Sequence, residues 1–200
     1  SVGLAIAPAH GDDPQTLMKH AGLALHKAKA NGKHQVQVFT EALNAEANYK
    51  LFVENNLRRA LTQNELEVFY QPKLCLKTGQ LHGMEALLRW QHETRGVLAP
   101  GAFLELGEES GLIVDVGRRV LHQAARHHRL LAEAGLGHMR IAVNVSPAQF
   151  TDELVRHVRE AIEEHGVPAD RIAFLPGHDG QLGPHASLHH RERWDNAQRP

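Results

Sequence analysis

Near the middle of this chain stands the sequence Glu85-Ala86-Leu87-Leu88-Arg89-Trp90, the end of an apolar run that starts at Leu81. A short apolar run of this length predicts a buried strand. The carboxylate of Glu85 can hold a divalent cation, and the planar guanidinium of Arg89 can hold a phosphate through two parallel hydrogen bonds. The stretch therefore predicts a strand that also carries binding groups.

The segments around this strand alternate between two kinds of pattern. Upstream, residues 66–76 form a strand candidate, and Lys77-Thr78-Gly79-Gln80 is a turn that joins it to 81–90 as a hairpin. Downstream, the spacing of apolar residues predicts helices over 100–111, 114–134 and 151–165, and strands over 141–145 and 171–174. Strands that alternate with helices favour an α/β fold with a parallel sheet.

The N-terminal part predicts a smaller strand–helix–strand piece. Residues 2–7 and 36–39 have strand character, and apolar residues recur at helical spacing from Leu17 to Ala28. Asn31-Gly32 is typical of a left-handed helix end. Residues 41–64 predict a linking helix with one broad apolar face.

Composition excludes several classes of protein. The net charge of −1 gives no argument for a nucleic-acid polymer or an anionic membrane surface as partner. No apolar run approaches the ~20 residues that a membrane span needs. The single cysteine, Cys75, excludes an internal disulfide and suits a reducing, cytoplasmic compartment. A chain that opens on a strand without a methionine is expected to be a fragment of a longer protein, which could itself be membrane-anchored.

Three motifs together resemble a known family. They are Phe69-Tyr70-Gln71-Pro72, the Glu85 to Trp90 stretch and Asn144-Val145-Ser146-Pro147. In this order and spacing they resemble the EAL family of cyclic di-GMP phosphodiesterases, which implies that residues 65–175 form the first half of a (β/α)8 barrel.

The resemblance also implies a site. Glu85 and Asn144 would be metal ligands for Mg²⁺ or Mn²⁺, and Gln71, Leu87 and Arg89 would bind the substrate, cyclic di-GMP. The complete parent would hydrolyse cyclic di-GMP to pGpG with two divalent ions, and it could form a homodimer through this domain. Ligands at the C-terminal ends of barrel strands suit this placement.

Residues 1–40 resemble the C-terminal end of a GGDEF, or diguanylate cyclase, domain. The likeness lies in the run from Ala21 to His34, in which Lys29 matches a lysine that contacts nucleotide phosphate in that family. The order of a GGDEF remnant, a linking helix over 41–64 and an EAL start is that of tandem signalling proteins.

The likeness to the EAL family stops after Arg171. Leu175 and His178 stand where the resemblance implies two acidic residues. The polar residues 176–200 predict a disordered or out-of-family tail, which suggests a frame change or an artificial end. His185, His189 and His190 could grip zinc, but chance enrichment among sixteen histidines is the preferred interpretation. We expect the chain alone to lack useful phosphodiesterase activity, because later family ligands are missing.

Simpler interpretations of each residue remain open. Glu85 could face solvent, Asn144 could cap a turn or helix, Arg89 could be a surface charge and Gln71 a strand-edge amide. For the whole chain the alternatives are a degenerate, non-catalytic module that binds cyclic di-GMP, or an incomplete domain whose unpaired strand edges cause association.

Overall fold

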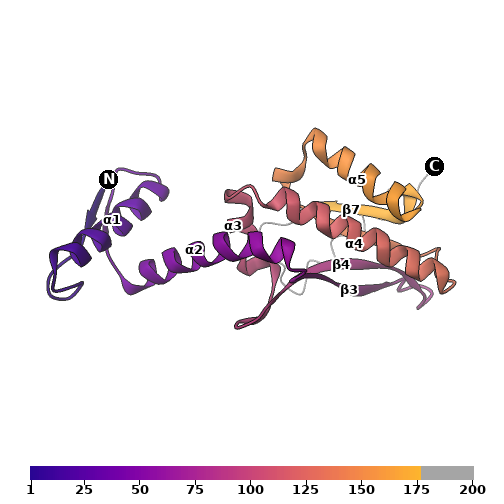
Figure 1. The fold of residues 1–200 in the computed structure, drawn as a ribbon, viewed down its shortest axis with the longest axis horizontal. Coiled ribbons are helices and arrows are strands. Elements are labelled where there is room, and N and C mark those ends of the chain that lie inside the picture. The colour runs from indigo at the N-terminus through magenta and orange to yellow at the C-terminus, as the bar shows by residue number, and fades with distance from the viewer. Residues whose placement is uncertain (177–200) are drawn as a thin grey trace. The chain divides into compact units, whose positions relative to one another are not determined.

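The computed structural model describes residues 1–176. Contacts divide the chain into two compact units, an N-terminal unit of residues 1–56 and a C-terminal unit that begins at residue 57 (Figure 1). The predicted tail falls outside the described residues apart from Pro176, and so do His178, His185, His189 and His190. Among the described residues no helix has both the length and the apolar character to cross a membrane.

The N-terminal unit is the strand–helix–strand piece that the sequence predicts. Its elements are β1 (Val2–Leu4), α1 (Pro14–Ala30), β2 (Val36–Val38) and the first part of α2 (Glu41–Thr62). The two strands are parallel. Asp13 begins α1 by accepting a hydrogen bond from the Thr16 amide at 2.9 Å. Gly3 is required because a Cβ there would collide with the backbone of α1.

The C-terminal unit holds a mixed sheet with helices between its parallel strands. Its elements after α2 are β3 (Leu66–Leu74), β4 (Leu81–His92), β5 (Gly96–Leu98), η1 (Pro100–Ala102), α3 (Leu104–Glu109), α4 (Ile113–Glu133), β6 (Arg140–Val145), η2 (Pro147–Gln149), α5 (Asp152–His165), η3 (Ala169–Arg171) and β7 (Ile172–Pro176). The strand order is β3-β4-β6-β7, with β5 paired to β4.

Pairing directions follow the connections. The short turn makes β3 and β4 antiparallel, whereas β4 with β6 and β6 with β7 are parallel pairs whose connections contain α4 and α5. This is the α/β alternation that the sequence predicts. The helix α4 packs on the sheet and on α5, so these two helices belong to the same layer (Figure 1).

The core lies between this helical layer and one face of the sheet. Alternate residues of β4, among them Ala86, Leu88 and Trp90, are buried there, and Trp90 is 0% exposed. The indole Nε1 of Trp90 donates to Glu65 at 3.0 Å, which satisfies its polar atom. The intervening side chains of β4, those of Glu85, Leu87 and Arg89, point to the opposite face of the sheet, which we call the open face.

Three details differ from the sequence-based prediction. The strand β5 was not predicted, because its three residues carry no periodic pattern. The single helix expected over 100–111 is a 3-10 turn followed by α3. Glu85 lies in the first half of β4 and not near the C-terminal end of a strand, because β4 continues beyond its parallel pairing with β6, which ends at Ala86, to pair with β3 and β5.

Candidate functional site

The open face brings together the two residues proposed as metal ligands. Glu85 of β4 pairs in register with Ala142 of β6, so Asn144, two residues further on, points to the same face. The Asn144 amide Nδ2 donates to Glu85 Oε1 at 2.8 Å. Side chains separated by 59 positions in the sequence therefore meet, and Glu85 is partly buried, with 17% of its side chain exposed.

A third side chain completes the contact, and sequence reasoning missed it. The ammonium of Lys73 lies 2.9 Å from Glu85 Oε2. Lys73 stands two residues beyond Gln71, the register partner of Glu85, and such diagonal neighbours are within reach of a long side chain. The predicted hairpin, which places Lys73 on the strand beside that of Glu85, was the available signal, although the turn alone does not give the register because the pairing shifts between Lys73 and Leu74. Glu85 is therefore held by a cation on one oxygen and by an amide on the other.

The proposed substrate-binding residues lie on the same face. Gln71 is directly opposite Glu85, Leu87 is opposite Phe69, and Arg89 follows two residues later on β4. The guanidinium of Arg89 lies 5.9 Å from the centre of the Phe69 ring, within cation–π range, and its Nη1 donates to the Leu88 carbonyl at 2.7 Å. The structure thus gathers all five predicted site residues on one face of β3, β4 and β6.

In the loop after β6, Ser146 and not Asn144 caps the following helical turn, η2. Ser146 is the N-cap of η2 and forms a reciprocal capping box with Gln149. Its hydroxyl also donates to Glu108 Oε1 at 2.5 Å. The Gln149 amide fills the space beside Gly117 of α4, where a Cβ would overlap it. Asn144 is thus not the cap, and its amide is directed to Glu85.

The neighbouring strand supplies no third ligand at the matching position. Leu175 of β7 pairs in register with Asn144 and is 6% exposed. Magnesium prefers about six oxygen ligands, including carboxylates. The contacting pair offers one carboxylate, already paired with Lys73, and one amide whose Oδ1 is the ligand atom. These residues fit part of a single-ion site, and they do not fit a two-ion site without further ligands.

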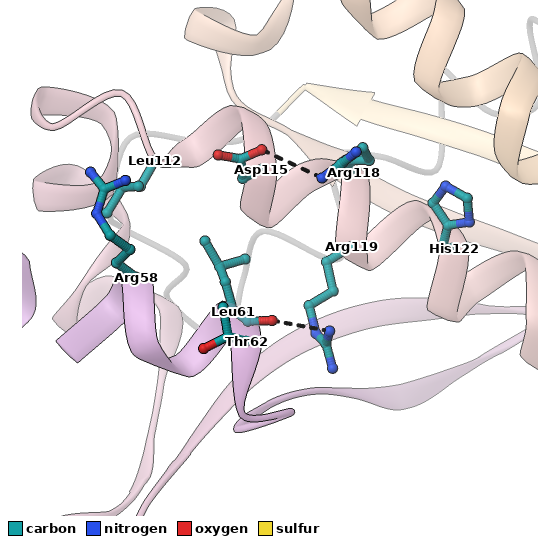
Figure 2. Close-up of a pocket in the computed structure, with 8 residues that line it drawn as sticks. All are labelled: Arg58, Leu61, Thr62, Leu112, Asp115, Arg118, Arg119 and His122. Carbon is teal, nitrogen blue, oxygen red and sulfur yellow. Dashed lines mark hydrogen bonds and ion pairs between the residues drawn. The ribbon is translucent and has the colours of Figure 1, made fainter.

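A pocket lies on the helical side of the sheet, apart from the residues of the open face (Figure 2). It has a volume of about 460 Å³ and is lined by Arg58, Leu61, Thr62, Leu112, Asp115, Arg118, Arg119 and His122. The guanidinium of Arg119 donates to the Leu61 carbonyl at 3.3 Å and to Asn64 Oδ1 at 2.7 Å. Arg119 therefore ties α4 to the end of α2, and no predicted site residue lines this pocket.

Comparison with known proteins now decides the family. The EAL domain family matches residues 54–176, a range that includes the whole described part of the C-terminal unit. The chain belongs to the EAL-domain family. The match contains the hairpin, both parallel pairs and all five residues of the open-face site.

Similar proteins agree with this assignment. The cyclic di-GMP phosphodiesterase NbdA of Pseudomonas aeruginosa is 41% identical over 170 residues, which cover 84% of this chain and 22% of NbdA. MucR of the same organism, a bifunctional diguanylate cyclase and cyclic di-GMP phosphodiesterase, is 40% identical over 173 residues, which cover 86% of this chain and 25% of MucR. The chain thus spans about a quarter of the length of these relatives.

A solved structure supports the fold. The PaMucR phosphodiesterase in complex with c-di-GMP has a TM-score of 0.61 and 36% sequence identity to this EAL chain. The superposition covers 73% of this chain and 60% of that one. The mixed α/β architecture of the EAL unit is therefore shared with a protein whose solved structure is a c-di-GMP complex.

Proposed function

We propose that this chain is part of a cyclic di-GMP signalling protein of the EAL phosphodiesterase type. The complete parent hydrolyses cyclic di-GMP to pGpG with two divalent ions, and residues 65–175 form the first half of its (β/α)8 barrel. Glu85 and Asn144 act as metal ligands, while Gln71, Leu87 and Arg89 line the nucleotide site. Bound Mg²⁺ or Mn²⁺ lowers the pKa of a coordinated water and neutralises charge on the phosphate.

The observation that carries this proposal is the contact between Glu85 and Asn144. The Asn144 amide nitrogen donates to a Glu85 carboxylate oxygen at 2.8 Å, so two side chains that can each supply a ligand oxygen lie together on the face that also holds Arg89. A cation bound between them would stand beside a guanidinium suited to a phosphate. The chain itself is proposed to be inactive, because the register position beside Asn144 holds Leu175 in place of a carboxylate.

A hydrolysis assay tests the activity. The 200-residue chain is incubated with cyclic di-GMP and Mn²⁺, and pGpG is measured by chromatography beside a complete EAL domain. We expect no turnover above the metal-only blank. Turnover comparable to that of the complete domain would overturn the proposed inactivity.

Calorimetry tests the ligand roles independently of turnover. Mn²⁺ is titrated into the chain and into Glu85→Gln, which keeps the shape and removes the charge. We expect weak Mn²⁺ binding that the substitution abolishes, with Glu67→Gln on the same face as the matched control. Equal binding by the chain and Glu85→Gln would rule out Glu85 as a ligand.

One observation favours a second function, a non-catalytic module that binds cyclic di-GMP. The Lys73 ammonium already neutralises Glu85, so the face presents a cationic and amide surface to a dinucleotide without any metal. In this case cyclic di-GMP binds equally with Mn²⁺ or with a chelator, and Arg89→Ala loses the binding while Glu85→Gln retains it. Binding that requires Mn²⁺ excludes the sensor, and no binding under either condition excludes both functions for this chain.

We also propose that residues 1–40 derive from a GGDEF domain and that residues 41–64 link it to the EAL unit. The 173-residue match with the bifunctional MucR is too long to lie only within 54–200, so it reaches into the N-terminal unit. The parallel β1 and β2 around α1 are compatible with this origin.

A further inference from the structure

A cluster of metal-binding side chains lies on the helical layer, away from the open face. It consists of His122 on α4 and of Glu164 and His165 in the last turn of α5. One ligand atom from each residue lies within 4.8 Å of the other two. His122 Nδ1 is 3.4 Å from Glu164 Oε2, and His165 Nε2 is 3.8 Å from Glu164 Oε1. Neither proposed function uses these residues.

The donor set matches one class of ion. Two imidazole nitrogens and one carboxylate oxygen are ligands of Zn²⁺, which takes three protein ligands and a water in open tetrahedral sites. Mg²⁺ and Ca²⁺ instead prefer oxygen ligands alone. Imidazole rings whose centres are 5.7 Å apart at 81° can direct their nitrogens at one point from different sides.

The local electrostatics combine favourable and opposing charges. The helix α5 ends at Gly166, which has a φ of 64°, and the carbonyl dipoles at a helix C-terminus attract cations. Glu164 adds a negative charge. Arg126 and Arg129 on α4 oppose a cation, but Arg129 is paired with Glu133 at 3.6 Å. The cluster therefore has a carboxylate and a helix end to balance the nearby arginines.

We propose that His122, Glu164 and His165 bind a Zn²⁺ ion. The ion joins the C-terminal turn of α5 to the middle of α4. Because α5 lies between β6 and β7 in the chain, the ion would stabilise the packing of the last described βα segment against the sheet. It is separate in place and in chemistry from the Mg²⁺ or Mn²⁺ proposed for Glu85.

Residue-resolved footprinting tests the proposal in a chain with sixteen histidines. The full chain is treated with diethyl pyrocarbonate with and without one equivalent of Zn²⁺, and modified peptides are quantified by mass spectrometry. We expect protection at His122 and His165 and unchanged modification of His138, an exposed histidine in the loop before β6. Protection spread over the other histidines, with none concentrated at 122 and 165, would overturn the site.

Substitutions provide the second measurement. The carboxylate variant Glu164→Gln changes a residue that is 62% exposed, so the fold is preserved. In each of the single variants Glu164→Gln, His122→Gln and His165→Gln, we expect the Zn²⁺ affinity measured by calorimetry to fall about 10- to 100-fold. A loss of this size is typical even when only a hydrogen-bond partner of a zinc ligand is removed. His138→Gln, at an exposed position outside the cluster, should bind Zn²⁺ as the unaltered chain does. Equal affinity in Glu164→Gln and the unaltered chain would contradict the proposal.

Discussion

At the scale of single residues, Glu85 sets the charge balance of the open face. Its two carboxylate oxygens contact the Lys73 ammonium and the Asn144 amide. A divalent ion that binds Glu85 must displace the ammonium or share the carboxylate with it. Because the side chains are 35% and 17% exposed, water screens this ion pair and its contribution is modest, about 0.2–1 kcal/mol.

The first prediction concerns Lys73→Gln. Removing the competing charge should tighten Mn²⁺ binding by about two- to fivefold, which corresponds to the energy of an ion pair that water partly screens. Calorimetry with Mn²⁺ measures this change. Lys77→Gln, an exposed lysine in the hairpin turn, is the control and should bind as the unaltered chain does. Weaker binding in Lys73→Gln would contradict competition.

On the helical side, Tyr70 and His127 form a polar pair between β3 and α4. The atoms Tyr70 Oη and His127 Nδ1 are 2.7 Å apart. Burial raises the pKa of Tyr70 well above its usual value, so the phenol stays neutral. Burial, with the nearby Arg126, lowers the pKa of His127. The pair therefore favours an uncharged histidine.

The second prediction follows from the lowered pKa of His127 in the folded chain. When a histidine has a lower pKa folded than unfolded, the unfolded chain binds more protons below pH ~6.5, so the free energy of unfolding falls as the pH falls. Urea unfolding at about pH 7.5 and pH 5.5 should show this loss, and His127→Gln should lose less stability between the two. His138→Gln should behave as the unaltered chain. If His127→Gln loses as much stability between the two pH values as the unaltered chain, His127 does not contribute to the pH dependence.

At the scale of elements, the pairing of β6 with β7 limits the metal site. Asn144 faces Leu175 across this pair, and an apolar side chain can neither bind a cation nor hold water. The parallel pairs β4–β6 and β6–β7 bring positions 85, 144 and 175 together. The residue at position 175 therefore decides how many oxygen ligands the site offers to a cation.

The third prediction is therefore Leu175→Glu. A second carboxylate beside Asn144 should tighten Mn²⁺ binding by about tenfold or more, since Mn²⁺ prefers charged oxygen ligands. The loss of a buried leucine should cost about 1.5–3 kcal/mol of stability. Leu175→Gln is the matched control, with the same shape and loss of apolar burial but no charge. Equal Mn²⁺ affinity in both variants would show that position 175 does not face the ion.

Much of this arrangement could be predicted from the sequence, because local patterns specify local structure. The hairpin, the helices α4 and α5 and the strands β6 and β7 were predicted from periodicity and turn residues, and they are confirmed. The strand β5 was missed because only pairing with β4 distinguishes it from a loop. The metal and substrate roles of the five site residues stay predictions.

Contacts between distant residues were beyond local patterns. The approach of Lys73 to Glu85 depends on the register of a strand pair, and the cluster of His122 with Glu164 and His165 depends on how α4 packs against α5. In the sequence those histidines are part of a general enrichment. Only the packing separates them from the others.

At the scale of the whole molecule, the described sheet has exposed edges. The strands at the two ends of the order β3-β4-β6-β7 are β3 and β7, and β5 pairs with β4 outside this order. Apolar side chains are exposed on both, with Phe69 at 46%, Leu74 at 58% and Phe174 at 40%. Unpaired strand edges with apolar residues promote pairing with other chains.

The fourth prediction is concentration-dependent association of the 200-residue chain. Sedimentation velocity at rising concentration should show species larger than a monomer, and Phe174→Lys should reduce them because a charged residue disfavours edge-to-edge pairing. Val155→Lys, at an exposed position on α5, is the matched control and should associate as the unaltered chain does. A monomer at every concentration would contradict the prediction.

The hydrogen bonds of Arg119 have a mechanical consequence. One guanidinium holds the Leu61 carbonyl, the Asn64 side chain and, at 3.4 Å, the Leu66 carbonyl, and so it bridges the end of α2 and the start of β3. Because one guanidinium bonds to both segments, we expect the end of α2 and the start of β3 to move together. A rotation of the end of α2 would then displace β3 as well. Because β3 carries Gln71 and Lys73, such a rotation would change the positions of these two side chains on the open face.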